Sequence, residues 1–343
     1  MTKKVAVIPG DGAGQEVVPE AVKVLKAAGA DFEFEDFDIN ADRFLRTGVA
    51  LPDDLYGQIK QADAILFGAI GDPRVKEAQY AREVLLRMRF ELDLYANLRP
   101  ARLYDDRLSP LRDPERRGID LLILRENTEG AYIGAGGRHK PGTEHEIAVQ
   151  EDVNTYLGVT RILEHAFRLA RREVCMVDKS NALNHAGALW QERWRALAPK
   201  HQGVRTRHLY VDAAAMELVR DPTQFDVIVT GNMFGDILSD LTAALVGGMG
   251  VAPSANLNPE TGRGLFEPVH GTAPSIAGRG IVNPLGAIGT AAMMTSHLGF
   301  EEIAKSIDAA VIAAVQAGEC TRDLGGSLST SEAGDAVVKR LKD

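Results

Sequence analysis

Residues 5–29, VAVIPGDGAGQEVVPEAVKVLKAAG, decide the fold class of this chain. The four apolar residues 5–8 are typical of a buried strand, and the glycine-rich residues 9–14 form a turn. Residues 16–28 carry apolar side chains at helical spacing and are followed by a glycine, Gly29. The stretch therefore predicts a strand, a tight turn and a helix in succession.

The same rhythm continues along the chain. Alternating residues 32–37 and apolar residues 62–67, 119–124, 174–177 and 227–229 are typical of strands, with helical spacing between them. This alternation predicts an α/β protein with parallel strands. Helices are expected to dominate after Gly231, and the uncharged residues 281–300 are expected to form a buried helix. Residues 136–142 lie between two extended stretches and indicate a hairpin tip or arm.

Length and composition limit the function classes. A chain of 343 residues predicts two lobes. The net charge of −9 argues against nucleic acid or an anionic membrane as a partner. Two cysteines, Cys175 and Cys320, suit a reducing cytosol, so a cytoplasmic location is expected.

The turn at Gly10 and Gly12 is a partial match to the Rossmann dinucleotide fingerprint. That fingerprint requires a third glycine at position 15, where this chain has Gln15. A tight turn before a helix is the favoured interpretation, and any dinucleotide is expected to bind elsewhere.

Polar residues follow the predicted strands, where open α/β sheets bind ligands. Arg125 ends one strand, and Arg89 and Arg99 lie in an arginine-rich segment before it. Guanidinium groups bind carboxylates in a bidentate manner, so converging arginines indicate a dicarboxylate substrate. Each arginine taken alone is equally consistent with a surface ion pair.

Two further clusters follow later strands. Asp236 and Asp240 are four residues apart on one helix face, which suits Mg²⁺ or Mn²⁺. The alternative is that Asp236 caps the helix and Asp240 is solvated. Lys179 at a strand end is either an acid–base residue or an ordinary surface lysine. Residues 265–280 form a dense polar loop whose function its residues alone leave open.

Together these segments resemble the β-decarboxylating dehydrogenase family, which includes isocitrate, homoisocitrate, tartrate and 3-isopropylmalate dehydrogenases. The resemblance runs nearly end to end and is strongest in residues 232–240, NMFGDILSD, and 266–274, FEPVHGTAP. It implies a two-lobed αβα sandwich, distinct from the Rossmann fold, with the active site in the interdomain cleft. Residues 1–94 plus 247–343 are the implied cofactor-binding domain. Residues 95–246 are the implied substrate, metal and dimerisation domain, with an arm near 130–150.

The resemblance also implies roles for individual residues. Arg89, Arg99 and Arg125 match the arginines that hold the malate carboxylates, and Asp236 and Asp240 match metal ligands. Asp212 matches a third ligand, which also contacts the substrate and comes from the other subunit of a homodimer with shared active sites. Lys179 matches a lysine that acts across that interface on the 2-hydroxyl, and Tyr132 matches the tyrosine that protonates the enol. The implied cofactor-binding residues are Glu267, His270, Gly271, Thr272, Ala273, Pro274, Ser275, Gly278, Asn283 and Asp323.

The expected reaction is the oxidative decarboxylation of 3-isopropylmalate to 4-methyl-2-oxopentanoate, a step of leucine biosynthesis. Leu85 and Leu86, about one helical turn before Arg89, are expected to pack against the isopropyl group. Two residues depart from the family pattern: Ser275 stands where NAD-using relatives have an acid, and Arg82 where some isopropylmalate enzymes have a glutamate. NAD is favoured because the lysine–tyrosine pair of NADP-using members is absent.

Several alternatives remain at this stage. D-malate, tartrate, homoisocitrate and isocitrate would undergo the same chemistry. A non-catalytic regulatory paralogue is disfavoured, because the arginines, aspartates, lysine and tyrosine of the site are all present.

Overall fold

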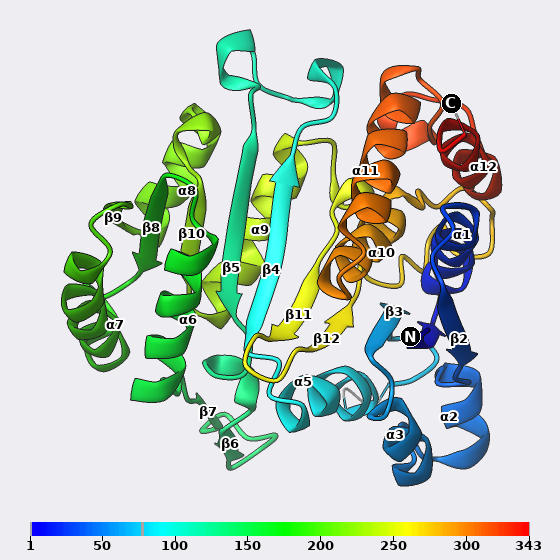
Figure 1. The fold of residues 1–343 in the computed structure, drawn as a ribbon. Coiled ribbons are helices and arrows are strands. Elements are labelled where there is room, and N and C mark those ends of the chain that lie inside the picture. The colour runs from blue at the N-terminus through cyan, green and yellow to red at the C-terminus, as the bar shows by residue number, and fades with distance from the viewer. Residues whose placement is uncertain (1, 77–78, 343) are drawn as a thin grey trace.

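A computed structural model of the protein describes residues 2–76 and 79–342. At its centre lies a ten-stranded mixed sheet in the order β2-β1-β3-β12-β11-β4-β5-β10-β8-β9 (Figure 1). A separate pair, β6 and β7, forms a hairpin. The strands are β1 (Lys3–Gly10), β2 (Phe32–Asp36), β3 (Ala64–Ala69), β4 (Ala96–Arg102), β5 (Asp120–Glu126), β6 (Gly136–His139), β7 (Ile147–Gln150), β8 (Glu173–Asp178), β9 (Arg205–Tyr210), β10 (Val227–Thr230), β11 (Ala255–Asn258) and β12 (Arg263–Phe266).

Helices cover both faces of the sheet. The α-helices are α1 (Gly14–Ala27), α2 (Ala41–Thr47), α3 (Asp53–Ile59), α4 (Gln79–Ala81), α5 (Arg87–Glu91), α6 (Tyr156–Leu169), α7 (Asn184–Leu197), α8 (Val211–Arg220), α9 (Asn232–Leu245), α10 (Leu285–His297), α11 (Glu301–Gln316) and α12 (Thr330–Arg340). Helices α1, α10, α11 and α12 pack together beside β1, β3 and β12. Helices α6 to α8 flank β8 to β10 (Figure 1). No described helix is long and apolar enough to cross a membrane.

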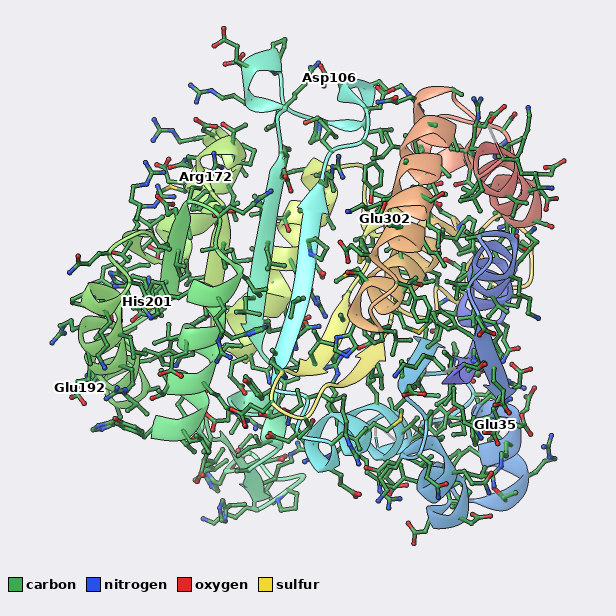
Figure 2. All side chains as sticks on the ribbon, viewed as in Figure 1. Glu35, Asp106, Arg172, Glu192, His201 and Glu302 are labelled. Atoms are coloured by element: carbon green, nitrogen blue, oxygen red, sulfur yellow. The ribbon has the colours of Figure 1, made fainter. Side chains whose placement is uncertain are left out.

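Three clusters of buried apolar side chains form the core. One lies within residues 6–94 together with Leu265, and a second lies within residues 95–229. The largest cluster joins residues from both ends of the sequence to residues from the middle of the sequence, such as Ile123, Phe225 and Leu238. Charged side chains such as Glu35, Glu192 and Glu302 lie at the periphery (Figure 2). The sheet and its main core are therefore continuous, and the division at residues 94/95 and 246/247 stays a prediction.

The predicted strands and the first helix are confirmed within a few residues. The turn at Gly10–Gly14 packs tightly, because the Ala13 N–H donates to the Thr272 carbonyl at 2.8 Å. The uncharged stretch contains the buried helix α10. The hairpin prediction needs a correction, because Gly136–His139 is itself a strand and the turn falls at residues 140–146.

The prediction that helices dominate after Gly231 overlooked β11 and β12. Strand β11 has the sequence ANLN, and all four of its residues are buried. Its asparagine side chains are bonded inside the protein, but asparagine is depleted in strands and the apolar–polar alternation is only four residues long, so the strand signal in the sequence is weak. Strand β4, which carries Arg99, was likewise not predicted as a strand.

Candidate active site

The candidate site begins where three parallel strands end together. Thr230 of β10 pairs with Arg125 of β5 on one side and with Val177 of β8 on the other. The polar residues that follow these strands therefore lie along one edge of the sheet, as the sequence predicted. Helix α9 starts at this edge with Asn232.

Arg125 is locked between β5 and α9. Its side chain is 1% exposed, and its Nε and Nη2 atoms donate to Asn232 Oδ1 at 2.9 and 2.7 Å. Its Nη1 donates to Asp236 Oδ1 at 2.5 Å. Gly235 makes this approach feasible, since a Cβ atom there would lie 2.6 Å from the Arg125 side chain. Burial, with the nearby positive charges of Arg99 and Arg89, lowers the pKa of Arg125 to about 9.

Arg99 reaches the same carboxylate from β4. Its Nη1 lies 3.0 Å from Asp236 Oδ1 and 3.9 Å from Asp240 Oδ1. Burial would raise the pKa of Asp236, but Arg125 and Arg99 outweigh it and lower that pKa. Burial dominates at Asp240 and raises its pKa. Asp236 is thus an anion fixed among cations, whereas Asp240 is more open, with 57% of its side chain exposed.

Tyr132 completes this cluster from the short 3-10 turn Ala131–Ile133. Its hydroxyl donates to Asp236 Oδ2 at 2.6 Å, and the Arg125 guanidinium lies 5.1 Å from the centre of its ring. Burial and the hydrogen bond to Asp236 raise the pKa of Tyr132. The phenol therefore keeps its proton at neutral pH, as a proton donor must.

Arg89 lies on α5 and makes a buried ion pair of 2.5 Å with Glu267 Oε1. The two residues are 6% and 7% exposed. Leu85 and Leu86 belong to a π-helical segment, Arg82–Leu86, that runs into α5. Both leucines are partly buried. Arg87 is directed elsewhere and pairs with Asp53 and Glu91, in agreement with its predicted position off the Arg89 face.

Lys179 and Asp212 form a second, separate group. Lys179 Nζ lies 2.5 Å from Asp212 Oδ1, and the Asp212 side chain is 66% exposed. The hydrogen bond from Lys179 lowers the pKa of Asp212. In the described ranges no hydrogen bond or ion pair joins these two residues to the arginine cluster.

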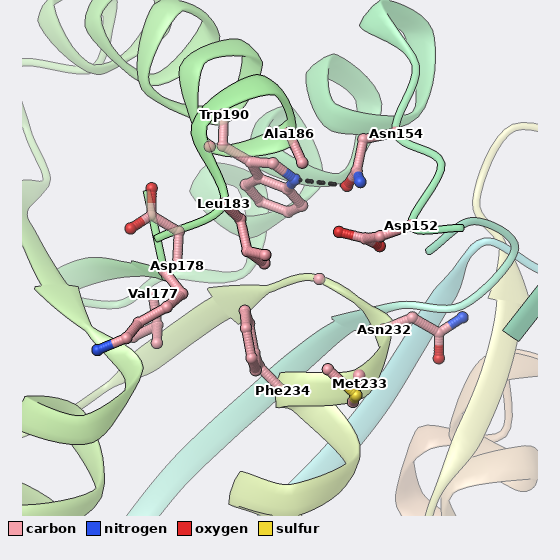
Figure 3. Close-up of a pocket in the computed structure, with 13 residues that line it drawn as sticks. Asp152, Asn154, Val177, Asp178, Leu183, Ala186, Trp190, Asn232, Met233 and Phe234 are labelled. Atoms are coloured by element: carbon pink, nitrogen blue, oxygen red, sulfur yellow. Dashed lines mark hydrogen bonds between the residues drawn. The ribbon is translucent and has the colours of Figure 1, made fainter. Parts of the chain in front are cut away.

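A pocket lies beside Lys179 (Figure 3). Trp190 closes one wall of it and donates from its indole nitrogen to Asn154 Oδ1 at 2.8 Å. Asn232 lines this pocket together with Lys179 and also accepts from Arg125, so the start of α9 lies between the pocket and the arginine cluster.

The metal prediction can be compared with these carboxylates. Asp236 and Asp240 supply hard oxygen ligands one helical turn apart, which fits part of a site for Mg²⁺ or Mn²⁺. Residues 2–76 and 79–342 of one chain hold no group of three or more His, Cys, Asp or Glu able to bind a metal. Asp212 of another subunit stays the predicted third ligand.

Part of the predicted cofactor loop lines a second pocket of about 690 Å³. His270, Ala273, Asn283 and Asp323 line it, and Asn283 Nδ2 donates to Asp323 Oδ2 at 2.9 Å. The Nε2 atom of His270 is buried without a hydrogen-bond partner, so it is available to a ligand group. The pocket fits a bound cofactor on this ground.

The other predicted cofactor residues do not line that pocket. Ser275 is exposed, the Thr272 carbonyl accepts from Ala13, and the Gly278 N–H donates to Glu16 at 2.6 Å. Glu267 pairs with Arg89 instead of lining the pocket. Gly271 is exposed and, like Pro274, does not line the pocket.

Several residues around these groups were not assigned a role from the sequence. Arg279, Arg322 and Glu332 line the second pocket. Asp178 accepts from Gln191 at 2.8 Å and bonds with His208 at 2.9 Å, which fixes the strand end before Lys179. These residues and their partners come from six separate parts of the chain, so only their polarity was visible in the sequence.

Comparisons with known proteins agree with this geometry. The family model "Isocitrate/isopropylmalate dehydrogenase" matches residues 4–337. A protein of Bifidobacterium longum subsp. infantis named 3-isopropylmalate dehydrogenase is 45% identical over 99% of both chains. Another so named, from Corynebacterium glutamicum, is 47% identical, again over 99% of each.

Solved structures of similar fold indicate the same family. An isocitrate dehydrogenase from Methylococcus capsulatus has a TM-score of 0.92 at 35% identity, covering all of both chains. A beta-decarboxylating dehydrogenase from Thermococcus kodakarensis has a TM-score of 0.83 at 37% identity, covering 100% of this chain and 97% of that one. The fold, the arginine–aspartate cluster and these matches together show that the chain belongs to the isocitrate/isopropylmalate dehydrogenase family of oxidoreductases.

Proposed function

We propose that the protein oxidises and decarboxylates 3-isopropylmalate to 4-methyl-2-oxopentanoate with NAD⁺, as a step of leucine biosynthesis, and that it works as a cytoplasmic homodimer. The observation that carries this proposal is the convergence of two buried arginines, Arg99 and Arg125, and Tyr132 on Asp236, with the buried Arg89 held nearby by Glu267. Such a cluster can bind a substrate with two carboxylates, one of which leaves as carbon dioxide.

The arginines position the substrate. Arg125 and Arg99 are held rigidly by Asn232, Ser239 and Asp236, so their guanidinium groups need little reorganisation when carboxylates bind. Tyr132 holds a proton at its hydroxyl for the carbon that loses carbon dioxide. Lys179 of a second copy accepts the proton of the 2-hydroxyl as hydride leaves.

The two absent groups have residues suited to them. Asp236 and Asp240, with Asp212 of the second copy, would hold Mg²⁺ or Mn²⁺, and His270, Asn283 and Asp323 would hold NAD. The metal supplies a Lewis acid and the nicotinamide accepts a hydride.

The choice of 3-isopropylmalate rests on the π-helical segment. Leu85 and Leu86 offer an apolar surface next to Arg89, which suits an isopropyl group. A tricarboxylate such as isocitrate needs another cation there, and Arg87 is occupied by Asp53 and Glu91. Relatives of 45% and 47% identity carry the name of the isopropylmalate enzyme.

The homodimer is supported by the separation of Lys179 and Asp212 from the cluster around Asp236. Helices α8 and α9 expose Met216, Val219, Met233 and Ile237, which are between 43% and 62% accessible. Adjacent apolar side chains of this size are typical of a subunit interface. A twofold copy seated on this face would bring its Lys179 and Asp212 toward the first chain's Asp236.

The test is NADH formation at 340 nm with Mn²⁺ on 3-isopropylmalate, isocitrate, homoisocitrate, D-malate and tartrate, each with NAD⁺ and with NADP⁺. We expect 3-isopropylmalate with NAD⁺ to lead in kcat/KM by about tenfold or more. A lead by a tricarboxylate or tartrate would reject the substrate assignment. No turnover of any of the five would point to a regulatory paralogue.

A further inference from the structure

A chain of buried hydrogen bonds joins the two arginines Arg99 and Arg89 through the middle of the sheet. Arg99 Nε donates to Asn97 Oδ1 at 2.8 Å, and Asn97 Nδ2 donates to Asn256 Oδ1 at 3.1 Å. Asn256 Nδ2 donates to Glu267 Oε1 at 2.9 Å, and the same oxygen accepts from Arg89 at 2.5 Å. The first three steps have ordinary hydrogen-bond lengths, and the charged Arg89–Glu267 step is shorter.

The sheet register places these groups on one face. Asn97 of β4 is paired with Arg125 of β5 on one side and with Asn256 of β11 on the other. Cross-strand partners point to the same face, so the asparagines lie on the arginine side of the sheet. The chain of bonds crosses from residues 95–246 to the remainder of the protein.

The amide of Asn256 is fully used. Its oxygen accepts from Asn97 and from Asn127 at 2.9 Å, and its nitrogen donates to the Leu265 carbonyl at 3.1 Å as well as to Glu267. Asn256 and Asn97 are both 0% exposed. An amide with four bonds has one orientation, and a buried group of this kind is costly to disturb.

We propose that Asn256 is a positioning residue for substrate binding, which sets the distance between the Arg89 and Arg99 guanidinium groups through Glu267 on one side and Asn97 on the other. Arg89 lies on a separate helix and pairs with no other acidic side chain in residues 2–76 and 79–342, so Glu267 is its anchor. Glu267 in turn keeps its carboxylate oxygen in place through Asn256. The inference rests on the proposed function, because it takes the two arginines as ligands of a dicarboxylate.

The first variants exchange donor and acceptor at fixed size. Asn256→Asp replaces the donating nitrogen by an acceptor that faces Glu267, and Glu267→Gln removes the anionic partner of Arg89. We expect each to raise KM for 3-isopropylmalate by about tenfold or more while KM for NAD⁺ changes less than threefold. Both changes act through the same Glu267 Oε1 atom, so the double variant is expected to raise KM no further than the larger of the two single effects. Losses that multiply in the double variant would overturn the proposal.

Asn258→Ala is the matched control. Asn258 lies on the same strand, is 4% exposed, and accepts from the Glu260 and Thr261 amides outside the chain of bonds. It is expected to lower Tm and leave KM unchanged. A rise in KM that simply followed the loss of Tm across all variants would show that Asn256 only stabilises the sheet. If Asn256→Asp does not fold, Asn256→Ala removes the donor without adding charge and is judged by the same criteria.

A crystal structure of the Asn256 variant gives a readout that needs no substrate. We expect Glu267 to leave Arg89 and the distance between the two guanidinium groups to change. An unchanged Arg89–Glu267 pair would refute the positioning role even if 3-isopropylmalate proved to be the wrong substrate. Failure of wild-type protein to use 3-isopropylmalate would instead refute the proposed function.

Discussion

The Tyr132 hydroxyl donates to Asp236 Oδ2 at 2.6 Å, while the other oxygen of the same carboxylate accepts from Arg125. One carboxylate thus orients both a substrate-binding cation and a protonated phenol. Asp236 is also a candidate metal ligand. The proton donor Tyr132 and the candidate metal site therefore share one carboxylate.

The first prediction concerns Tyr132. In Tyr132→Phe the hydride step retains its residues, but the proton donor is lost, so overall turnover is expected to fall by about a hundredfold or more. Single-turnover quenched-flow sampling should then find NADH and carbon dioxide formed ahead of 4-methyl-2-oxopentanoate, a lag that the wild type does not show. Unchanged turnover would remove Tyr132 from the proton path.

The second prediction tests whether active sites are shared. Lys179→Ala and Asp236→Asn are each expected to be inactive as homodimers. Mixing the two after reversible dissociation should form hybrids with one intact site, which gives about a quarter of wild-type activity for random pairing. Mixtures that stay inactive, with hybrids confirmed by mass spectrometry, would place each complete site within one chain.

The third prediction concerns the apolar segment before Arg89. Leu85→Ser removes apolar contact area from the expected isopropyl pocket, so kcat/KM for 3-isopropylmalate should fall by about tenfold to a hundredfold. D-malate serves as the internal control, because it lacks the side group and should be affected much less. An equal loss on both substrates would show that Leu85 supports the fold of the segment and not its specificity.

The fourth prediction concerns stability against pH. His165 is 8% exposed, and neither of its ring nitrogens has a hydrogen-bond partner. Burial, with Arg168 nearby, lowers the pKa of His165 from 6.5 to about 4. Below pH 6.5, His165 is therefore protonated in the unfolded chain but stays neutral in the folded chain. The free energy of unfolding falls as the pH drops from about 6.5 to 4.

The full loss from this group is about 3 kcal/mol at the acid end of that window. His165→Leu is expected to flatten the pH dependence of the free energy of unfolding by that amount, measured by urea denaturation from pH 7.5 to 4. His201→Leu is a control at a more accessible histidine of the same region. An identical slope in wild type and His165→Leu would contradict the assignment.

The local elements could be predicted from the sequence because their signals are local. Residues 5–8 and 174–177 are apolar runs, and the β1 and β8 strands that they form are buried along most of their length. The helical spacing after Gly14 and the glycine at position 29 likewise define α1. Strand β11 was not predicted because its alternation is only four residues long and two of the four residues are asparagine, which is depleted in strands.

The sequence by itself determined the α/β class, the residue types of the site and the strand ends at which Arg125, Lys179 and Asn232 lie, since each depends on short-range patterns. Only the tertiary structure decided that Arg89 pairs with Glu267 and that Asn256 connects Arg89 to Arg99. It also decided that Lys179 lies with Asp212, apart from Asp236. These relations join residues up to 178 positions apart. Distances across a sheet depend on strand order and register, which no local pattern contains.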